Sequence, residues 1–373
     1  MAGGGPGGTP SVLVVSPRRR PVRAEVATSV SRVMDGLRVP VIAAPMAGGV
    51  STPELVVAVG AAGGLGFLAT GYLSPERVKE QIRRTRALDR CPFGVNLFVP
   101  GSPSGADLTE YSRVIERESR AIGVAPGEPR WEDDDYRAKL DLLIADPVPV
   151  VSFTFGAPTA SDVRRLQRAG SRVVVTVTSP AEARLAEATG ADALCLQGIE
   201  AGGHRAVFVD DGHSPAGGPA HELLELIRSV RAEIDLPLIA AGGLADGASI
   251  AAALAAGATA AQLGTALLRC PEAGTRPAHR KALTEGRATA LTRAFTGRPA
   301  RGLVNTMLSR LSETAPAAYP EVHHLTAPMR AAFAAAGDPE GISAWAGTGS
   351  DRTREQPAAG LIDELAEEIA SRR

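Results

Sequence analysis

The sequence predicts an α/β fold, a (β/α)8 or TIM barrel with an insertion after strand three and a mostly helical C-terminal cap. Three observations predict it. Eight short runs of β-branched and apolar residues alternate with amphipathic helical segments, the pattern of a parallel sheet built from βα units. Several runs are continuously apolar, as expected for strands covered on both faces. The units repeat evenly, which favours a closed barrel over an open doubly wound sheet.

The predicted strands follow one another from residue 39 to residue 263. They comprise residues 39–44, 65–69, 93–98, 148–153, 172–177, 193–197, 238–241 and 260–263. Glycines 63, 170, 190 and 257 follow predicted helices, at the position where a positive φ commonly ends a helix.

Helix starts are marked by hydroxyl residues. Thr52, Ser74 and Ser179 each precede a proline, which is favoured at the first helical position. Ser179 and Glu182 also match a capping box. The signals place helices between the predicted strands, as a barrel requires.

The chain divides into three predicted parts. Residues 1–25 are rich in Gly and Pro, and we expect them to form a disordered leader. They do not match a secretory signal, because their basic residues follow the short apolar run and do not precede it. Residues 26–349 form the barrel, with a surface insertion at about 99–147 and a helical cap at about 271–349. Residues 350–373 form a C-terminal helix or tail.

Composition excludes several classes of partner. The chain has 373 residues, with 40 basic and 41 acidic side chains and a net charge of -1, so no concentrated basic field favours nucleic acid or an anionic membrane. The uncharged stretch 248–268 reads as a helix followed by a buried strand. Three widely spaced cysteines suggest neither a disulfide framework nor a metal site, so we expect a cytoplasmic protein without a metal. Whether two copies form a homodimer is left open.

The predicted carboxyl ends of the strands, where barrels carry their active sites, are polar and rich in glycine. Gly242–Gly243 and Gly264 follow strands seven and eight, where bare backbone N–H groups can bind a phosphate. Asn96 and Gln197 end strands three and six, and their amides suit the uracil-like edge of a flavin. Together these residues predict FMN, although Gly242–Gly243 alone is equally consistent with a simple turn.

His204 is the candidate catalytic residue. It follows strand six among glycines, where an imidazole can act as a base beside a flavin. A lone histidine is more often structural, but its position favours function. Glu200, in the same loop, either orients His204 or pairs with an arginine, and Cys195 is interpreted as core packing.

The sequence resembles the nitronate monooxygenase family, formerly called 2-nitropropane dioxygenases. The resemblance covers residues 39–349 and rests on motifs in the family's order: Ala44-Pro45-Met46-Ala47-Gly48-Gly49, Val95-Asn96-Leu97-Phe98, Ser152-Phe153-Thr154-Phe155-Gly156, the block from Gln197 through Glu200-Ala201-Gly202-Gly203-His204-Arg205, Ala240-Ala241-Gly242-Gly243 and Gln262-Leu263-Gly264-Thr265.

The resemblance implies an FMN enzyme that oxidises alkyl nitronates, and possible nitroalkane substrates, with O2 to a carbonyl compound and nitrite. His204 matches the family's catalytic histidine, which takes the α-proton of a neutral nitroalkane. The residues implied in FMN binding are Ala44, Pro45, Met46, Asn96, Gln197, Gly202, Gly203, Ala241, Gly242, Gly243, Gln262, Leu263, Gly264 and Thr265.

Three positions depart from the family pattern and bear on substrate choice. Ala44 and Thr348 stand where glutamine is frequent, and Ala206 stands where glycine is common. Two alternatives remain. One is an NAD(P)H-dependent flavin reductase, such as an enoyl-[acyl-carrier-protein] reductase or a quinone reductase, which shares the Gly-Gly-His loop. The other is a flavin-binding barrel without turnover.

Overall fold

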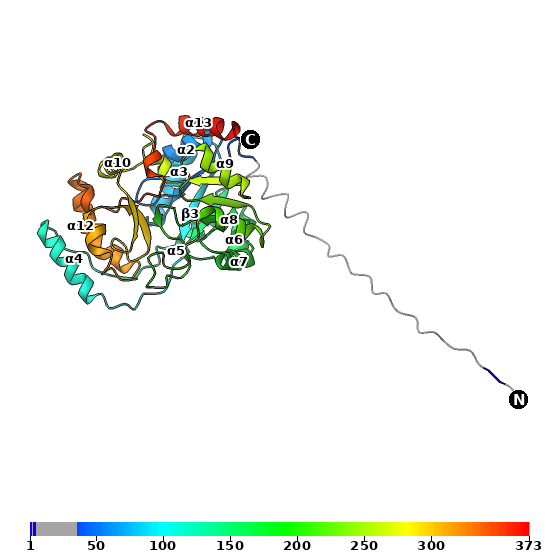
Figure 1. Cartoon of the computed structure of the whole chain (residues 1–373), viewed down its shortest axis with the longest axis horizontal. Coiled ribbons are helices and arrows are strands. Elements are labelled where there is room, and N and C mark those ends of the chain that lie inside the picture. Colours follow the sequence, from blue (N-terminus) through cyan, green and yellow to red (C-terminus); the bar gives the residue numbers. More distant parts are fainter. Residues whose placement is uncertain (2, 5–35, 373) are drawn as a thin grey trace.

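The computed structural model describes residues 1, 3–4 and 36–372 (Figure 1). The predicted disordered leader at 1–25 lies almost entirely outside the described residues. The described chain comprises a barrel and a smaller cap, which contains α4 and α12 and lies to the left of the barrel in Figure 1.

Eight parallel strands form the barrel, and all eight predicted strands are confirmed to within about two residues. The strands are β1 Val41–Ala43, β2 Gly66–Ala69, β3 Phe93–Phe98, β4 Val150–Thr154, β5 Arg172–Val177, β6 Ala193–Gln197, β8 Leu238–Ala241 and β9 Ala260–Leu263. Their order is β1-β9-β8-β6-β5-β4-β3-β2, and a parallel bridge between Ile42 and Leu65 joins the first strand to the last. The sheet therefore closes on itself.

Helices surround the strands. They are α2 Pro53–Ala61, α3 Pro75–Leu88, α5 Tyr136–Ala145, α6 Ala160–Ala169, α7 Pro180–Ala188, α8 Leu223–Arg231, α9 Gly247–Ala255 and α13 Ala358–Ala370. The C-terminal helix α13 packs on α9 and α2, so the last residues complete the ring of helices around the barrel.

The predicted helix caps form, with one exception. Thr52, Ser74 and Ser179 accept hydrogen bonds from the N–H groups of Leu55, Arg77 and Glu182. The capping box at Ser179 was wrong. The Glu182 carboxylate binds the N–H and hydroxyl of Thr178 and the N–H of Phe208, which ties the start of α7 to the loop that follows β6.

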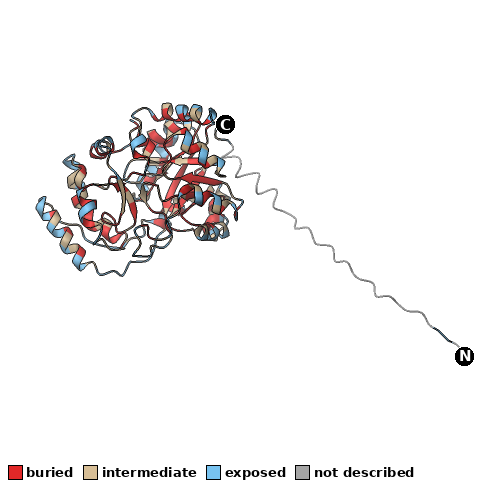
Figure 2. Ribbon diagram, viewed as in Figure 1, coloured by how far each residue is buried: buried red, intermediate tan, exposed pale blue. Residues whose placement is uncertain are grey.

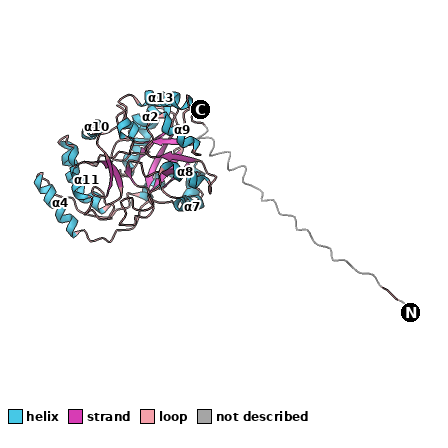
Figure 3. Ribbon diagram, in the orientation of Figure 1, coloured by secondary structure: helices cyan, strands magenta, loops and turns pink. Residues whose placement is uncertain are grey.

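The cap contains a small sheet that the sequence did not predict (Figure 3). Its helices are α4 Thr109–Ala121, α10 Pro277–Thr284, α11 Thr306–Leu311 and α12 Glu321–Ala335, with short 3-10 turns at Thr265–Leu267, Pro339–Gly341 and Ser350–Arg352. The antiparallel strands are β10 Thr289–Thr292, β11 Ala300–Leu303 and β7 Gly203–His204, in the order β10-β11-β7. Because β7 belongs to the loop after β6, this sheet joins the cap to the barrel mouth.

The buried residues fall into separate cores (Figure 2). One lies between strands and helices and includes Val41 and Leu263, while a second fills the barrel with residues such as Ile42 and Phe67. Ring atoms of Phe67 lie 2.2 Å from where a Cβ of Gly94 would stand, so a glycine there makes room for the aromatic side chain. A further core lies beneath α12 and α4 in the cap. The cap thus has an apolar core of its own.

No helix of the described residues is long and apolar enough to cross a membrane. Within the same part of the chain, no group of three or more His, Cys, Asp or Glu side chains lies close enough together to hold a metal ion.

Candidate functional site

A cavity of about 550 Å³ lies between the carboxyl ends of the strands and the cap. It brings together every predicted site residue except one. The lining includes Ala44, Pro45, Met46, Asn96, Gln197, Gly202, Gly203, His204, Ala241, Gly242, Gly243, Gln262, Gly264 and Thr265. The exception is Leu263, which is fully buried in the core between strands and helices. Because side chains alternate along a strand, Gln262 faces the cavity and its neighbour faces away.

His204 is held in the wall of the cavity by backbone, hydroxyl and aromatic contacts. It pairs with Ala300 in the small sheet, and its Nε2 lies 2.9 Å from the Thr296 hydroxyl. Phe155, Tyr319 and Trp345 surround the ring with centroid distances of 5.8, 5.7 and 5.4 Å. Burial, followed by the charges of Arg298 and Arg330, lowers the pKa of His204 to about 3. The imidazole is therefore neutral at physiological pH.

Gln197 forms hydrogen bonds with the loop that carries His204. Its Oε1 accepts from the Ala206 N–H at 2.8 Å and from Arg205 Nη1 at 3.1 Å, and its Nε2 donates to the His204 carbonyl at 2.9 Å. The predicted contact of Gln197 with a flavin stays a prediction, and the structure adds that its oxygen already accepts from its own loop. Gln197 fixes the path of the chain to His204.

Asn96 presents a free donor to the cavity. Its Oδ1 accepts from the hydroxyls of Ser152 at 2.8 Å and Thr154 at 3.0 Å, which orients the amide. The side-chain NH2 has no acceptor among the described residues, and Asn96 is only 2% exposed. A buried amide donor without a partner is costly, so this group fits a ligand acceptor such as a ring carbonyl.

Two strand-end turns supply backbone N–H groups. Gly242 and Gly243 have φ values of 127° and 68°, which favour glycine, and a Cβ at Gly243 would come within 3.0 Å of Glu200 Cβ. Among the described residues, the N–H groups of Gly242, Gly243, Gly264 and Thr265 donate to no protein acceptor. Clustered free N–H groups of this kind bind anions, and the predicted phosphate site fits them.

Gly202 lets two segments of the cavity wall pack closely. A Cβ there would lie 2.4 Å from the Gly347 nitrogen, so the loop after β6 passes directly against the segment Ala346–Gly347.

The loop after β1 is held in shape by Ser51. Its hydroxyl accepts from the Met46 N–H at 2.9 Å and donates to the Ala44 carbonyl at 3.3 Å. Both contacts bring cavity-lining backbone into place.

The cap supplies further lining residues that sequence reasoning missed. These are Thr296, His279, His323, Arg330 and Trp345, together with Arg276. Among the described residues, no Asp or Glu side chain lines the cavity. Only the tertiary fold places these residues over the barrel mouth, and the adjacent histidines 323 and 324 offered no metal-binding spacing that would have singled them out.

An aromatic wall separates this cavity from a second one of about 490 Å³. Tyr72, Phe98 and Phe155 line both cavities. Tyr72 and Phe155 have positive φ values of 67° and 77°, which are unusual for bulky residues, and the hydroxyl of Tyr319 donates to that of Tyr72 at 3.1 Å. The wall is built from residues held in unfavourable backbone geometry, as is common at functional sites.

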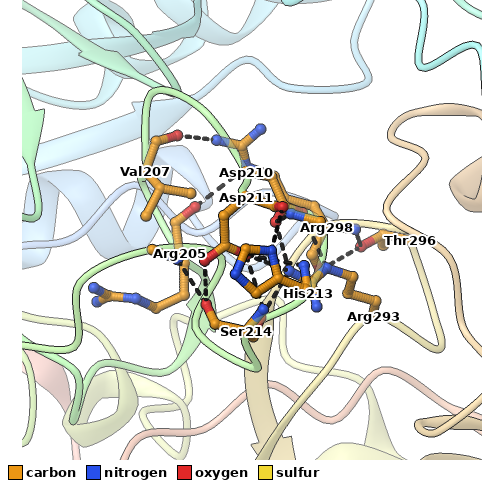
Figure 4. A network of polar contacts seen from close by, with 11 residues as sticks. Arg205, Val207, Asp210, Asp211, His213, Ser214, Arg293, Thr296 and Arg298 are labelled. Atoms are coloured by element: carbon orange, nitrogen blue, oxygen red, sulfur yellow. Dashed lines mark hydrogen bonds and ion pairs between the residues drawn. The ribbon is translucent and has the colours of Figure 1, made fainter.

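Buried arginines hold the loop after β6 against the cap (Figure 4). The Arg298 guanidinium stacks on Phe155, 3.8 Å from the ring centroid, and donates to the carbonyls of Arg205 and Val207. Arg293 pairs with Asp210 and donates to the Ser214 carbonyl. These contacts set Thr296, which lies between the two arginines in sequence, against His204.

The structure also settles Glu200 and Cys195. The Glu200 carboxylate accepts from the Leu223 N–H at 3.0 and 3.2 Å, so it caps α8 and forms neither of the contacts considered for it. Cys195 is buried inside the barrel, where Gln262 Nε2 lies 3.4 Å from its sulfur. Burial raises the pKa of Cys195 to about 12, which makes the thiol unreactive.

The family model described as nitronate monooxygenase matches residues 31–368 of the chain. The chain belongs to the nitronate monooxygenase family. Members of this family are oxidoreductases, and the likeness suggested by the sequence motifs is confirmed.

Three relatives align with about nine-tenths of this nitronate monooxygenase family member. It is 42% identical to a nitronate monooxygenase of Pseudomonas aeruginosa, over 90% of this chain and 97% of the relative. The solved structure of a nitroalkane oxidase from Streptomyces ansochromogenes is 49% identical, covers 91% of this chain and 98% of its own, and has a TM-score of 0.89. FabK from Thermotoga maritima is 27% identical over 91% and 96% of the chains, with a TM-score of 0.71.

In this nitronate monooxygenase family member, only one of the three departures from the family pattern faces the cavity. Ala44 lines it, whereas Ala206 is buried with its N–H on Gln197, and the Thr348 N–H donates to the Glu200 carbonyl at 3.0 Å. Of the three positions, we therefore expect Ala44 to affect which substrate the chain accepts.

Proposed function

We propose that this chain oxidises alkyl nitronates, and nitroalkanes, with FMN and O2, releasing a carbonyl compound and nitrite. The observation that carries the proposal is the juxtaposition of a neutral, half-buried His204 with a cavity wall that bears arginines and, among the described residues, no carboxylate. Such a cavity suits an anionic substrate and can take up a proton. The names of the Pseudomonas and Streptomyces relatives support the same reaction.

The residues around the cavity fit FMN. The free N–H groups of Gly242, Gly243, Gly264 and Thr265 would hold its phosphate, and the Asn96 NH2 would donate to an acceptor of its ring. Ala44, Pro45 and Met46 would supply apolar and backbone contacts along the same wall. When bound, the flavin supplies the electron acceptor that no side chain provides.

His204 would act differently on the two substrate forms. A neutral nitroalkane must lose its α-proton, and the neutral imidazole can accept it. Negative charge that develops on the nitro group raises the proton affinity of the adjacent ring, which offsets the low pKa caused by burial. A nitronate is already deprotonated, so His204 would only help to position it.

The proposed reaction balances when two nitronate ions and one dioxygen give two carbonyl compounds and two nitrite ions. The test is aerobic turnover of ethyl nitronate by the purified protein. We expect a flavin absorption spectrum, oxygen consumption, and equal amounts of acetaldehyde and nitrite. A protein with bound flavin that forms no nitrite would contradict the proposal, and NADPH-dependent reduction of enoyl or quinone substrates would favour a reductase.

A further inference from the structure

Arg330 presents part of its guanidinium to the cavity without an anionic partner. On α12, its Nε donates to the Thr326 hydroxyl at 3.0 Å, and its Nη2 donates to the His323 carbonyl at 2.8 Å and lies 3.3 Å from His323 Nδ1. No Asp or Glu of the described residues lies within 4.0 Å of the guanidinium nitrogens. Nη1 donates to no group of the described chain, so two N–H groups remain for a ligand.

Withdrawing the Arg330 guanidinium from water costs free energy unless an anion pairs with it. Burial lowers the pKa of Arg330 to about 10, and the nearby charge of Arg276 contributes to this shift. Buried charges in proteins are normally paired, but none of the described residues that line the cavity supplies a carboxylate. His323 stacks on Tyr72 with a centroid distance of 4.2 Å, which holds the arginine's own acceptor in place. The guanidinium is thus oriented before a ligand arrives.

We propose that Arg330 recognises the nitronate group of the substrate, with Nη1 donating to its negatively charged oxygens. This inference rests on the proposed function. A nitronate is planar and spreads its charge over two oxygens, which suits the geometry of guanidinium donors. Arg330 lines the same cavity as His204 and is close enough to influence its titration. Arg330 therefore determines specificity for the anion over the neutral nitroalkane.

Other arginines do not fit this role. Arg298 lines the second cavity, stacks on Phe155 and donates to backbone carbonyls of the loop after β6. Arg205 is fully buried beneath that loop, with Nη1 on the carbonyls of Gln197 and Gly198. Both hold the backbone in place. Arg276 also lines the cavity, but it is exposed, and no hydrogen bond among the described residues orients its guanidinium. Arg330 differs from all three because its guanidinium is oriented by the protein and still has donors free at the cavity.

The test compares Arg330→Met, Arg330→Lys and the control Arg83→Met in the purified holoenzyme. Arg83 is a surface residue of α3, with 71% of its side chain exposed. Binding of nitrate, a planar anion without a carbon chain, is measured by titration calorimetry at constant ionic strength. The KM values for ethyl nitronate and nitroethane, and the flavin content, are measured in parallel.

We expect Arg330→Met to weaken nitrate binding and to raise the KM for ethyl nitronate by roughly 10- to 100-fold, the usual range for losing a charge-assisted hydrogen bond. The KM for nitroethane and the flavin content should change little. Arg330→Lys should recover part of the affinity, and Arg83→Met should match the wild type. If Arg330→Met does not fold, Arg330→Gln carries the same expectation.

Unchanged nitrate affinity and unchanged KM for ethyl nitronate in Arg330→Met would overturn the proposal. Loss of flavin with nitrate affinity retained would also overturn it, because Arg330 would then bind the cofactor. Failure of the proposed function appears separately, as a wild-type protein that oxidises no nitronate. In that case nitrate titration alone decides whether Arg330 is an anion site.

Discussion

At the scale of residues, His204 is the group whose role is most open to test. His204→Asn keeps a polar side chain but removes the proton acceptor. We expect the kcat/KM for nitroethane to fall by roughly 100-fold or more, which is the usual contribution of a general base. Ethyl nitronate oxidation should remain within several-fold of wild type, because this substrate needs no deprotonation. Loss of neither activity would rule out the assignment of His204.

Sequence reasoning identified some site residues and misjudged others for clear physical reasons. Asn96 and His204 were predicted because polar residues at strand ends of a barrel face its mouth. The protein partners of Gln197 were not predicted, because its oxygen accepts from the N–H of Ala206, nine residues later, through the fold of the loop. Arg330 carries no local signal, since only the packing of α12 over the mouth brings it to the cavity.

At the scale of elements, one buried ion pair anchors the insertion to the barrel. Lys139 on α5 is fully buried, with Nζ 2.8 Å from Asp134 Oδ2 and 3.1 Å from the Thr70 carbonyl. Asp134 also accepts from the Tyr72 N–H at 2.8 Å. The pair therefore fixes the positive-φ conformation of Tyr72, a residue of the cavity wall.

Lys139→Met should destabilise the protein by about 3–5 kcal/mol, because it leaves the Asp134 charge buried without a partner. Urea unfolding measures the loss. The double variant Lys139→Met with Asp134→Asn should recover part of it, and Lys281→Met, at an exposed lysine of α10, should have little effect. Equal stability of Lys139→Met and wild type would show that the pair does not anchor the insertion.

The barrel elements were predictable and the small sheet was not. Each barrel strand lies within a short, mainly apolar run that is bounded by turn and cap residues, so local pattern and structure agree. Strand β7 has two residues and pairs with β11, whose partner residues lie almost one hundred positions later. So short a strand has no periodicity of its own. Its pairing arises from the tertiary contacts that dock the cap.

At the scale of the whole molecule, three histidines whose pKa values are lowered in the folded chain make stability depend on pH. Burial lowers the pKa values of His204, His279 and His323 to about 3, 4 and 2. In the unfolded chain these rings titrate near the ordinary value of about 6.5. The unfolded state therefore binds more protons below that pH, so stability is complete above about pH 6.5 and falls as the pH drops toward 4.

Each such histidine should contribute a slope of up to about 1.4 kcal/mol per pH unit in this window. Urea unfolding of wild type and His279→Gln at pH 7.5, 6.0 and 5.0 tests this. The variant should lose less stability on acidification, by about one histidine's share of the slope. Parallel loss in the two proteins would show that His279 takes up protons equally well in the folded state.

The central claim is that this barrel passes electrons from a nitronate to a bound flavin. Anaerobic mixing of the purified protein with ethyl nitronate, followed by visible spectroscopy, tests it most directly. The account predicts that ethyl nitronate bleaches the flavin absorption and that NADPH at the same concentration does so far more slowly. Rapid bleaching by NADPH with none by the nitronate would contradict the account and identify a flavin reductase.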